Sequence, residues 1–255
     1  MVHFIGAGPG AADLITVRGA GLLRSADVVI YAGSLVNPAL LENLKPGCEV
    51  RNSAFMTLEE VLGVMEAANR AGKDVARLHS GDPCLYGAVR EQMDALDRRG
   101  IPWDVTPGVS SFCGAAAALG VEYTLPGVSQ SVLLTRMPGK TPVPEAERLR
   151  TLAAHGASLV VFLSGGMADA VQAELLESGA YAPGTPAAIV HKATWDDEEI
   201  IRCTVGTLAH AAKSAGIRKH ALILVGDFLG ASYERSKLYD PSFSTEYREG
   251  ASCMT

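Results

Sequence analysis

Short apolar runs that end in a glycine-rich turn and lead into a helical pattern recur along this chain, and they restrict its fold most strongly. In the clearest case, residues 74–78 are compatible with a short buried strand, Ser80-Gly81-Asp82-Pro83 forms the turn, and residues 88–99 have amphipathic helical spacing. This alternation predicts an α/β fold whose parallel strands are joined by right-handed crossovers. Ligands bind beyond the carboxyl ends of such strands, so the turn marks a candidate site.

Each residue of this turn has a property that suits a ligand site. Gly81 lets the backbone approach a ligand closely, Asp82 offers hydrogen-bond acceptors, and Pro83 fixes the turn before the helix. An ordinary strand-to-helix turn also uses these residue types. The turn alone therefore leaves both interpretations open.

A second candidate loop follows the first predicted strand, residues 2–5. Gly6, Gly8 and Ala11 in this loop match the spacing of the dinucleotide fingerprint, so a nicotinamide-dependent dehydrogenase, or a sensor that binds a nucleotide without catalysis, has to be considered. The next helix is expected to begin only after Thr16 as its N-cap, which leaves its amides poorly placed for a pyrophosphate.

The acid that would bind a ribose in a dinucleotide site is also misplaced. Asp27 is the acid nearest the expected interval, but it precedes the predicted strand 28–31. A ribose-binding acid should follow that strand. This order disfavours the dehydrogenase interpretation.

A third loop, Thr106-Pro107-Gly108-Val109-Ser110-Ser111, follows the predicted strand 102–105 and precedes a helix of small residues at 115–118. The hydroxyls of Ser110 and Ser111 suit the polar edge of a ligand. Serine at the start of a helix is also a common cap.

The remaining pattern predicts two α/β domains with a cofactor cleft between them. We expect an N-terminal domain at 1–126, a C-terminal domain at 127–240, and a surface tail at 241–255. Further strands are predicted at 28–31, 49–51, 129–135, 158–163, 187–191, 199–204 and 221–225, and further helices at 58–71, 145–154, 167–177 and 206–215.

Composition disfavours several classes of function. The formal net charge of −6 disfavours a general nucleic-acid binder, which usually carries a basic surface. Five cysteines, at scattered spacings and without a Cys-x-x-Cys motif, predict neither a disulfide framework nor a zinc site. No apolar run approaches the length of a membrane span or a signal peptide, so we expect a soluble protein of the cytoplasm.

The sequence identifies no catalytic side chain and no metal site. It contains no Ser-His-Asp pattern, no paired carboxylates and no histidine-rich motif, and His3 and His79 lie at predicted strand positions that favour a structural role. What remains is a set of small-residue loops at strand ends, which suits the binding of a small cofactor by backbone groups.

Several of these motifs together resemble the tetrapyrrole (class III) S-adenosylmethionine-dependent methyltransferases. They are Gly6-Ala7-Gly8-Pro9-Gly10, Asp13-Leu14-Ile15-Thr16, and Ser80-Gly81-Asp82-Pro83 with Tyr86-Gly87. Within the family, the stretches 107–136, 141–145, 192–195 and 236–239 resemble the members that methylate carbon 11 of precorrin-4 or of its cobalt form during cobalamin biosynthesis. The resemblance covers nearly the whole chain.

The resemblance implies a homodimer with the tetrapyrrole methylase fold, and S-adenosylmethionine as its cofactor. It carries the cofactor contacts to Pro9, Ser80, Gly81, Asp82, Leu85, Tyr86, Ser110, Ser111, Ser164 and Ala193. Relatives often have Ala and Met where this chain has Ser111 and Ser164. For Cys84, inside the same loop, the resemblance implies no role.

A tetrapyrrole with acetate and propionate groups requires local cations on an acidic protein. Candidates for these carboxylates are Arg136 and Lys140 above all, then Arg51 and Arg90, with Lys192 and Arg202 as further possibilities. Any one of them is also compatible with a solvated surface charge. A sibling methyltransferase that acts on another ring carbon or another acceptor remains an alternative, and the sequence does not distinguish a cobalt-containing from a metal-free substrate.

Overall fold

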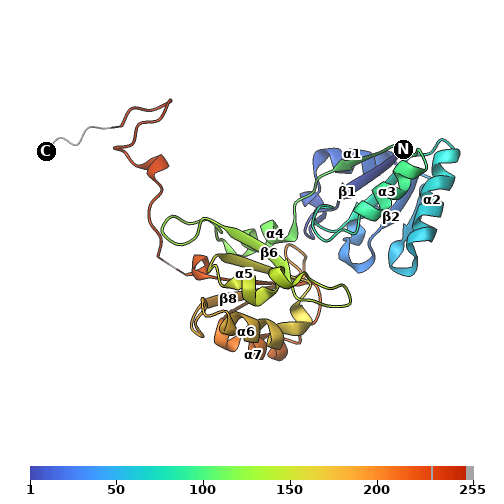
Figure 1. The fold of residues 1–255 in the computed structure, drawn as a ribbon. Coiled ribbons are helices and arrows are strands. Elements are labelled where there is room, and N and C mark those ends of the chain that lie inside the picture. Colours follow the sequence, from blue (N-terminus) through green and yellow to red (C-terminus); the bar gives the residue numbers. More distant parts are fainter. Residues whose placement is uncertain (231, 251–255) are drawn as a thin grey trace. The chain divides into compact units, whose positions relative to one another are not determined.

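The computed structural model describes residues 1–230 and 232–250, and the chain forms two compact units (Figure 1). The first unit contains Met1–Ala118 together with Lys192–Glu199, and the second contains Leu119–His191 and the chain from Ile200 onward. The boundary expected at residue 126 lies a short way beyond this division. The expected tail at 241–255 lies partly outside the described residues, and Cys253 is one of the residues outside them.

The first unit is built on a five-stranded sheet in which every neighbouring pair of strands is parallel, in the order β3-β2-β4-β1-β5. Its strands are β1 Val2–Gly6, β2 Val28–Tyr31, β3 Glu49–Asn52, β4 Val75–His79 and β5 Trp103–Thr106. The parallel sheet predicted for this half of the chain is confirmed. Because the strands run in one direction, the loops that follow them gather at one edge of the sheet.

Helices cover both faces of this sheet. They are α1 Val17–Ser25, α2 Leu58–Arg70, α3 Arg90–Arg98 and α4 Ser111–Leu119. One apolar cluster joins α2 and α3 to strand residues such as Phe4 and Ile30, and another joins α1 to the opposite face through Ile5 and Val29. The helices that follow β1 and β4 therefore lie on opposite faces of the sheet.

The predicted starts of two helices are confirmed by their caps. The Thr16 hydroxyl accepts a hydrogen bond from the Gly19 amide at 3.2 Å. Thr57 and Glu60 form a reciprocal capping box. The helix predicted from residue 88 begins instead at Arg90, because Ala88 has a φ of 46°, which is incompatible with a right-handed helix.

The second unit is built on a mixed sheet in the order β6-β7-β10-β8-β9. β6 Val132–Arg136 is parallel to β7 Ser158–Phe162, whereas β10 Ala221–Val225 is antiparallel to both β7 and β8 Pro186–His191. The edge strand β9 spans Glu199–Thr204. The strand-loop-helix repeat seen in the sequence thus leads to a sheet that is only partly parallel.

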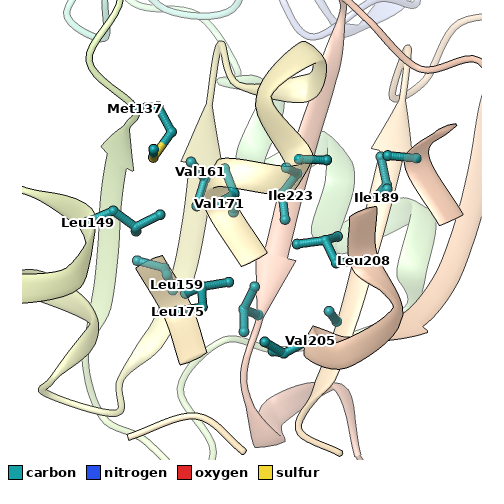
Figure 2. Packing of buried hydrophobic residues seen from close by; sticks show 14 of the residues in the cluster. Met137, Leu149, Leu159, Val161, Val171, Leu175, Ile189, Val205, Leu208 and Ile223 are labelled. Carbon is teal, nitrogen blue, oxygen red and sulfur yellow. The ribbon is translucent and has the colours of Figure 1, made fainter. Parts of the chain in front are cut away.

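The core of this unit lies between the sheet and its helices α5 Leu149–Ala153, α6 Ala168–Glu177 and α7 Leu208–Ser214. Figure 2 shows Leu159, Val161 and Ile223 of the central strands packed against Val171 and Leu175 of α6. α5 is shorter than the helix predicted at 145–154, because Arg148 is extended and interrupts it.

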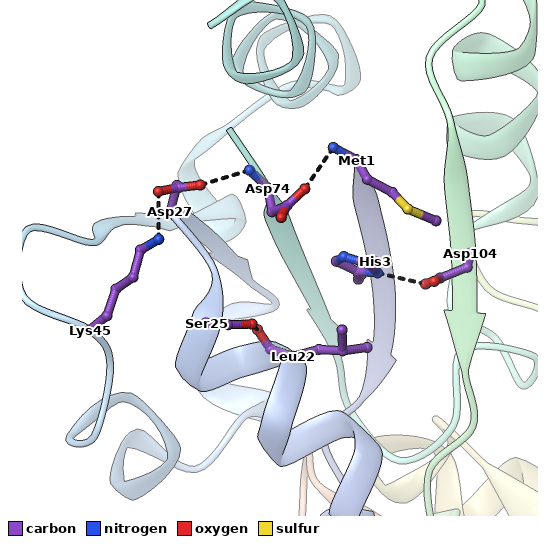
Figure 3. Close-up of polar contacts among 8 residues, drawn as sticks. All are labelled: Met1, His3, Leu22, Ser25, Asp27, Lys45, Asp74 and Asp104. Atoms are coloured by element: carbon purple, nitrogen blue, oxygen red, sulfur yellow. Dashed lines mark hydrogen bonds and ion pairs between the residues drawn. The ribbon is translucent and has the colours of Figure 1, made fainter. Parts of the chain in front are cut away.

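At the amino-terminal edge of the first sheet, ion pairs and hydrogen bonds join the ends of several strands (Figure 3). Asp27 accepts from the Lys45 ammonium at 2.6 Å and from the Asp74 amide at 2.9 Å. The Lys45 ammonium, aided by the Asp74 amide, lowers the pKa of Asp27 below its ordinary value. His3 pairs with Asp104 at 2.9 Å. Asp27 is thus engaged at the edge opposite the glycine loops.

Within the described ranges, no helix combines the length and the apolar composition that crossing a membrane requires.

Candidate active site

Three strand ends of the first unit meet backbone to backbone at glycines. Gly8 and Gly81 form an isolated bridge in which the Gly81 amide donates to the Gly8 carbonyl at 2.8 Å and the Gly8 amide donates to the Gly81 carbonyl at 3.2 Å. A Cβ added to Gly108 would lie 2.2 Å from the Gly81 carbonyl oxygen, and one added to Gly6 would lie 2.5 Å from the Cα of Gly108. Only glycine fits at these contacts.

This meeting point lies where two neighbouring parallel strands lead to helices on opposite faces of the sheet. The loop after β1 leads to α1 on one face, and the loop after the neighbouring β4 leads to α3 on the other. Loops that separate in this way open a crevice at the carboxyl edge of the sheet, where ligands of α/β proteins bind. Asp27 lies at the opposite edge, and α1 begins only at Val17, so the acid and the helix amides that a dinucleotide site requires are not here.

Asp82 connects two of the loops. Its Oδ1 accepts from the Cys84 amide at 2.8 Å, and its Oδ2 accepts from the Gly108 amide at 2.9 Å. Burial acts to raise the pKa of Asp82, but hydrogen bonds from the Cys84 side chain and backbone and from the Gly108 amide outweigh burial and lower it. The site therefore holds an ionised carboxylate, and Cys84 acquires the role of a donor to it.

The segment that follows Asp82 is conformationally strained. Tyr86 and Ala88 have φ values of 56° and 46°, and a Cβ on Gly87 would lie 2.3 Å from the Pro83 carbonyl oxygen. Tyr86 is nevertheless 44% exposed. Left-handed backbone at residues other than glycine clusters at functional sites, so this loop is a strong candidate for ligand contact.

A segment from late in the sequence completes the site in the first unit. The Thr194 hydroxyl accepts from the Ala11 amide at 2.9 Å, and a Cβ on Gly10 would lie 2.7 Å from the Ala193 carbonyl oxygen and 2.2 Å from the Trp195 ring. The Lys192 ammonium is paired with Asp197 and lies 5.7 Å from the centre of the Trp195 ring. No periodicity or spacing in the sequence indicated this contact.

The structure places eight of the ten predicted cofactor residues in these four loops of the first unit, and Ser111 at the first residue of α4, directly after one of them. The eight are Pro9, Ser80, Gly81, Asp82, Leu85, Tyr86, Ser110 and Ala193. Ser164 belongs to the second unit and is fully buried, with its hydroxyl donating to the Phe162 carbonyl at 2.7 Å and accepting from the Met137 amide at 3.0 Å. Its hydroxyl thus links the ends of β6 and β7.

The predicted substrate cations differ in how they are already paired. Arg51 forms an ion pair with Glu49 at 2.6 Å, and Arg90 forms one with Asp94 at 2.7 Å. The Arg136 guanidinium instead donates to the carbonyls of Met137, Thr141 and Pro142, at 2.9 to 3.2 Å, so it orders the loop after β6, and no carboxylate of the described residues pairs with it. Lys140, in the same loop, is exposed.

Among the other cations considered, Arg202 donates to the Leu119 carbonyl at 3.0 Å. No group of three or more His, Cys, Asp or Glu side chains in the part of the chain that the structure describes is arranged to hold a metal ion. Sequence reasoning missed two buried polar residues beneath the strained loop, Arg77 and Gln92. The one signal for them was an arginine inside an otherwise apolar run.

Comparison with known proteins identifies the family. A sequence model of the tetrapyrrole (corrin/porphyrin) methylases matches residues 1–209. The cobalt-precorrin-4 C(11)-methyltransferase of Methanocaldococcus jannaschii is 51% identical over 97% of this chain and 96% of its own. The precorrin-4 C(11)-methyltransferase of Pseudomonas aeruginosa is 45% identical over 98% of this chain and 99% of its own.

Comparison with solved structures leads to the same family. The crystal structure of a cobalamin biosynthetic enzyme, cobalt precorrin-4 methyltransferase, matches with a TM-score of 0.88 and 48% identity over 90% of this chain and 96% of that one. The uroporphyrin-III C-methyltransferase of Thermus thermophilus, complexed with S-adenosylhomocysteine, matches with a TM-score of 0.74 and 27% identity over 90% and 93% of the two chains. This chain therefore belongs to the tetrapyrrole (corrin/porphyrin) methylase family.

Proposed function

We propose that this protein transfers the methyl group of S-adenosylmethionine to carbon 11 of precorrin-4 or cobalt-precorrin-4, giving the corresponding precorrin-5 in cobalamin biosynthesis. Relatives at 44 to 51% identity over nearly the whole chain bear one of these two substrate names. The observation from this structure that supports the proposal is the ionised Asp82 carboxylate at the meeting point of the glycine loops.

The chemistry of the four loops fits this cofactor. S-adenosylmethionine carries a sulfonium and an ammonium, and a carboxylate favours cations nearby. Residues 7–16, 80–89, 107–110 and 192–199 contain one cation between them, Lys192, which is paired with Asp197. A dinucleotide pyrophosphate would instead require helix amides directly after the glycines, whereas α1 begins only at Val17.

We assign cofactor binding to Pro9, Ser80, Gly81, Asp82, Leu85, Tyr86, Ser110, Ser111 and Ala193, and the Ser164 backbone to the same role. Backbone amides and carbonyls at the glycines and hydroxyls at Ser110 and Ser111 provide polar contacts, and the half-buried Leu85 and exposed Tyr86 provide apolar surface.

The cofactor supplies an activated methyl group, which a nucleophilic carbon of the substrate can accept directly. The protein then needs no nucleophile of its own, which agrees with the lack of a Ser-His-Asp pattern in the sequence. Its residues align the reacting atoms, and such orientation contributes about 7–11 kcal/mol in favourable systems.

We assign the acidic substrate to Arg136 and Lys140 in the loop after β6, because Arg136 forms no ion pair with any residue that the structure describes. Arg51 and Arg90 are weaker candidates, since Glu49 and Asp94 already pair with them. We also propose that the enzyme acts as a homodimer in the cytoplasm. Light scattering of the purified protein tests the dimer, which a monomeric mass would refute.

The test of the proposed function compares acceptors. Purified protein is incubated with labelled S-adenosylmethionine and enzymatically generated precorrin-4, with and without cobalt, and with uroporphyrinogen III as the control acceptor. Mass spectrometry should find one added methyl group on a precorrin-4 form and none on the control. Transfer to uroporphyrinogen III alone would assign the chain to a sibling activity and refute the proposal.

A further inference from the structure

Two buried polar side chains anchor the strained loop from below. Gln92 of α3 is 5% exposed, and its Nε2 donates to the Ala88 carbonyl at 3.0 Å. His79, the last residue of β4, is 3% exposed, and its imidazole is hydrogen-bonded to the Gly87 backbone. The two anchors therefore hold the two residues that immediately follow Tyr86.

Arg77 determines how Gln92 is oriented. Its Nε donates to the Gln92 Oε1 at 3.2 Å, and its Nη1 donates to the carbonyls of Ile30 and Leu78, each at 3.3 Å. A guanidinium has donors only, so it fixes the oxygen of the Gln92 amide on its own side and turns the NH₂ group toward Ala88. Arg77 is itself 7% exposed, and burial lowers its pKa to about 10, so it stays charged at neutral pH.

These groups are costly to bury, and core packing alone does not account for them. No carboxylate in the described ranges pairs with Arg77, and the Nε2 of His79 has no hydrogen-bond partner among the same residues. An apolar side chain would avoid both costs. What the polar groups provide is a fixed backbone at Gly87 and Ala88, in a loop where Tyr86 and Ala88 have φ values of 56° and 46°. Such strain persists only where the surroundings impose it.

We propose that Gln92 and His79, with Arg77 behind Gln92, are positioning residues that hold the loop 85–88 in the shape required for cofactor binding. This inference rests on the proposed function, because it assigns Leu85 and Tyr86 to the cofactor. The three residues act through the loop and do not contact the cofactor themselves.

Gln92→Glu tests the hydrogen bond from Gln92 to the loop without removing the contact between residue 92 and Arg77. Glutamate keeps an acceptor for Arg77, but it loses the NH₂ donor to Ala88. Titration calorimetry with S-adenosylhomocysteine should show a Kd raised about fivefold, which corresponds to about 1 kcal/mol for one lost hydrogen bond. His79→Phe keeps a ring beside Phe4, removes the unpartnered nitrogen and loses the bond to Gly87, and should raise the Kd similarly.

Leu96→Ala is the matched control. Leu96 is fully buried on the same helix, α3, and lies in the apolar cluster between that helix and the sheet. This variant should unfold at a lower temperature than Gln92→Glu, yet it should bind S-adenosylhomocysteine more tightly than Gln92→Glu does. If affinity instead follows the melting temperature across the three variants, the residues are merely structural and the proposal is overturned.

Hydrogen exchange without ligand distinguishes failure of this inference from failure of the proposed function. Amides 85–89 should exchange faster in Gln92→Glu and His79→Phe than in the parent protein and Leu96→Ala. Unchanged exchange and unchanged affinity would refute the positioning role while leaving the methyltransferase intact. A parent protein that does not bind S-adenosylhomocysteine would refute the proposed function, and the cofactor role of the loop with it, whatever the exchange rates.

Discussion

Gly108→Ala tests whether the three glycine loops must meet backbone to backbone. The added Cβ would lie 2.2 Å from the Gly81 carbonyl oxygen, 2.7 Å from the Gly6 Cα and 2.9 Å from the Gly6 carbonyl carbon. All three atoms belong to the backbone, so no side chain can rotate away, and the ends of β1, β4 and β5 have to separate. Overpacking of this kind costs about 1–3 kcal/mol.

We expect a destabilisation at the upper end of that range, because the separation also lengthens the bond from the Gly108 amide to Asp82. In a chain of this size, about 3 kcal/mol corresponds to a melting temperature lower by about 6–12 °C. Binding of S-adenosylhomocysteine should weaken by more than about tenfold, because Gly81 and Asp82 both shift.

Gly63→Ala is the control with the same chemical change. Gly63 lies on the exposed side of α2, and a Cβ there would meet nothing within 4 Å. Alanine is the better helix former by about 1 kcal/mol, so this variant should melt slightly higher and bind ligand normally. Differential scanning calorimetry and ligand titration measure both effects. A Gly108→Ala protein that melts within about 2 °C of the parent and keeps its affinity would show that the three loops need not meet backbone to backbone.

Three further predictions concern other parts of the first and second units. Asp82→Asn puts an NH₂ group where a carboxylate oxygen now accepts a hydrogen bond, so the Kd for S-adenosylhomocysteine should rise about tenfold or more. The same carboxylate raises the pKa of the Cys84 thiol, so Asp82→Asn should also accelerate alkylation of Cys84 by iodoacetamide at mildly alkaline pH. An unchanged alkylation rate would contradict the contact between Asp82 and the Cys84 thiol. Burial and the Arg77 charge lower the pKa of His79 to about 3, so between that value and about 6.5 the unfolded chain binds one proton more than the native one. The contribution of His79 to the free energy of unfolding should therefore be complete above about pH 6.5 and fall by up to about 1.4 kcal/mol per pH unit below it. Urea unfolding of His79→Phe should show a shallower pH dependence than that of the parent protein. Equal slopes would refute a neutral buried His79. Arg136→Lys cannot maintain the three carbonyl contacts of the guanidinium, so the KM for the tetrapyrrole should rise while the Kd for S-adenosylhomocysteine stays the same; a change in the latter alone would remove Arg136 from the substrate role.

Much of the first unit could be predicted from the sequence because local signals and burial agree there. The apolar runs of β1, β2 and β4 are short and bounded by glycine, and the Thr57 capping box marks the start of α2. The position of Asp27 before β2 was enough to disfavour a dinucleotide site, and its engagement with Lys45 agrees with that interpretation.

Features that depend on tertiary contacts could not be predicted from local pattern. The antiparallel pairing of β10 follows from how the chain crosses the second sheet, which periodicity does not encode. The segment Lys192–Glu199 returns to the first unit through contacts of Thr194 and Trp195 with the first glycine loop. Only the family resemblance placed Ala193 in the site.

The anchors of the strained loop illustrate the same limit. Gln92 lies on a strongly polar helix, where its residue type indicates an exposed position, but it is buried. Its role depends on the hydrogen bond to Ala88, a residue whose left-handed φ is not evident from its type. Arg77 is a charged residue within the buried strand β4, which the sequence alone shows, but its role follows only from its hydrogen bond to Gln92.

The measurement that tests the account most directly is the position of the transferred carbon. The enzyme would be supplied with S-adenosylmethionine carrying a carbon-13 methyl group and with precorrin-4, with and without cobalt, and the purified product examined by carbon NMR. We expect a single labelled methyl group on carbon 11, and the preferred substrate form identifies the pathway branch. A labelled methyl group on any other ring carbon, or no transfer to either form by a protein that binds S-adenosylhomocysteine, would contradict this expectation.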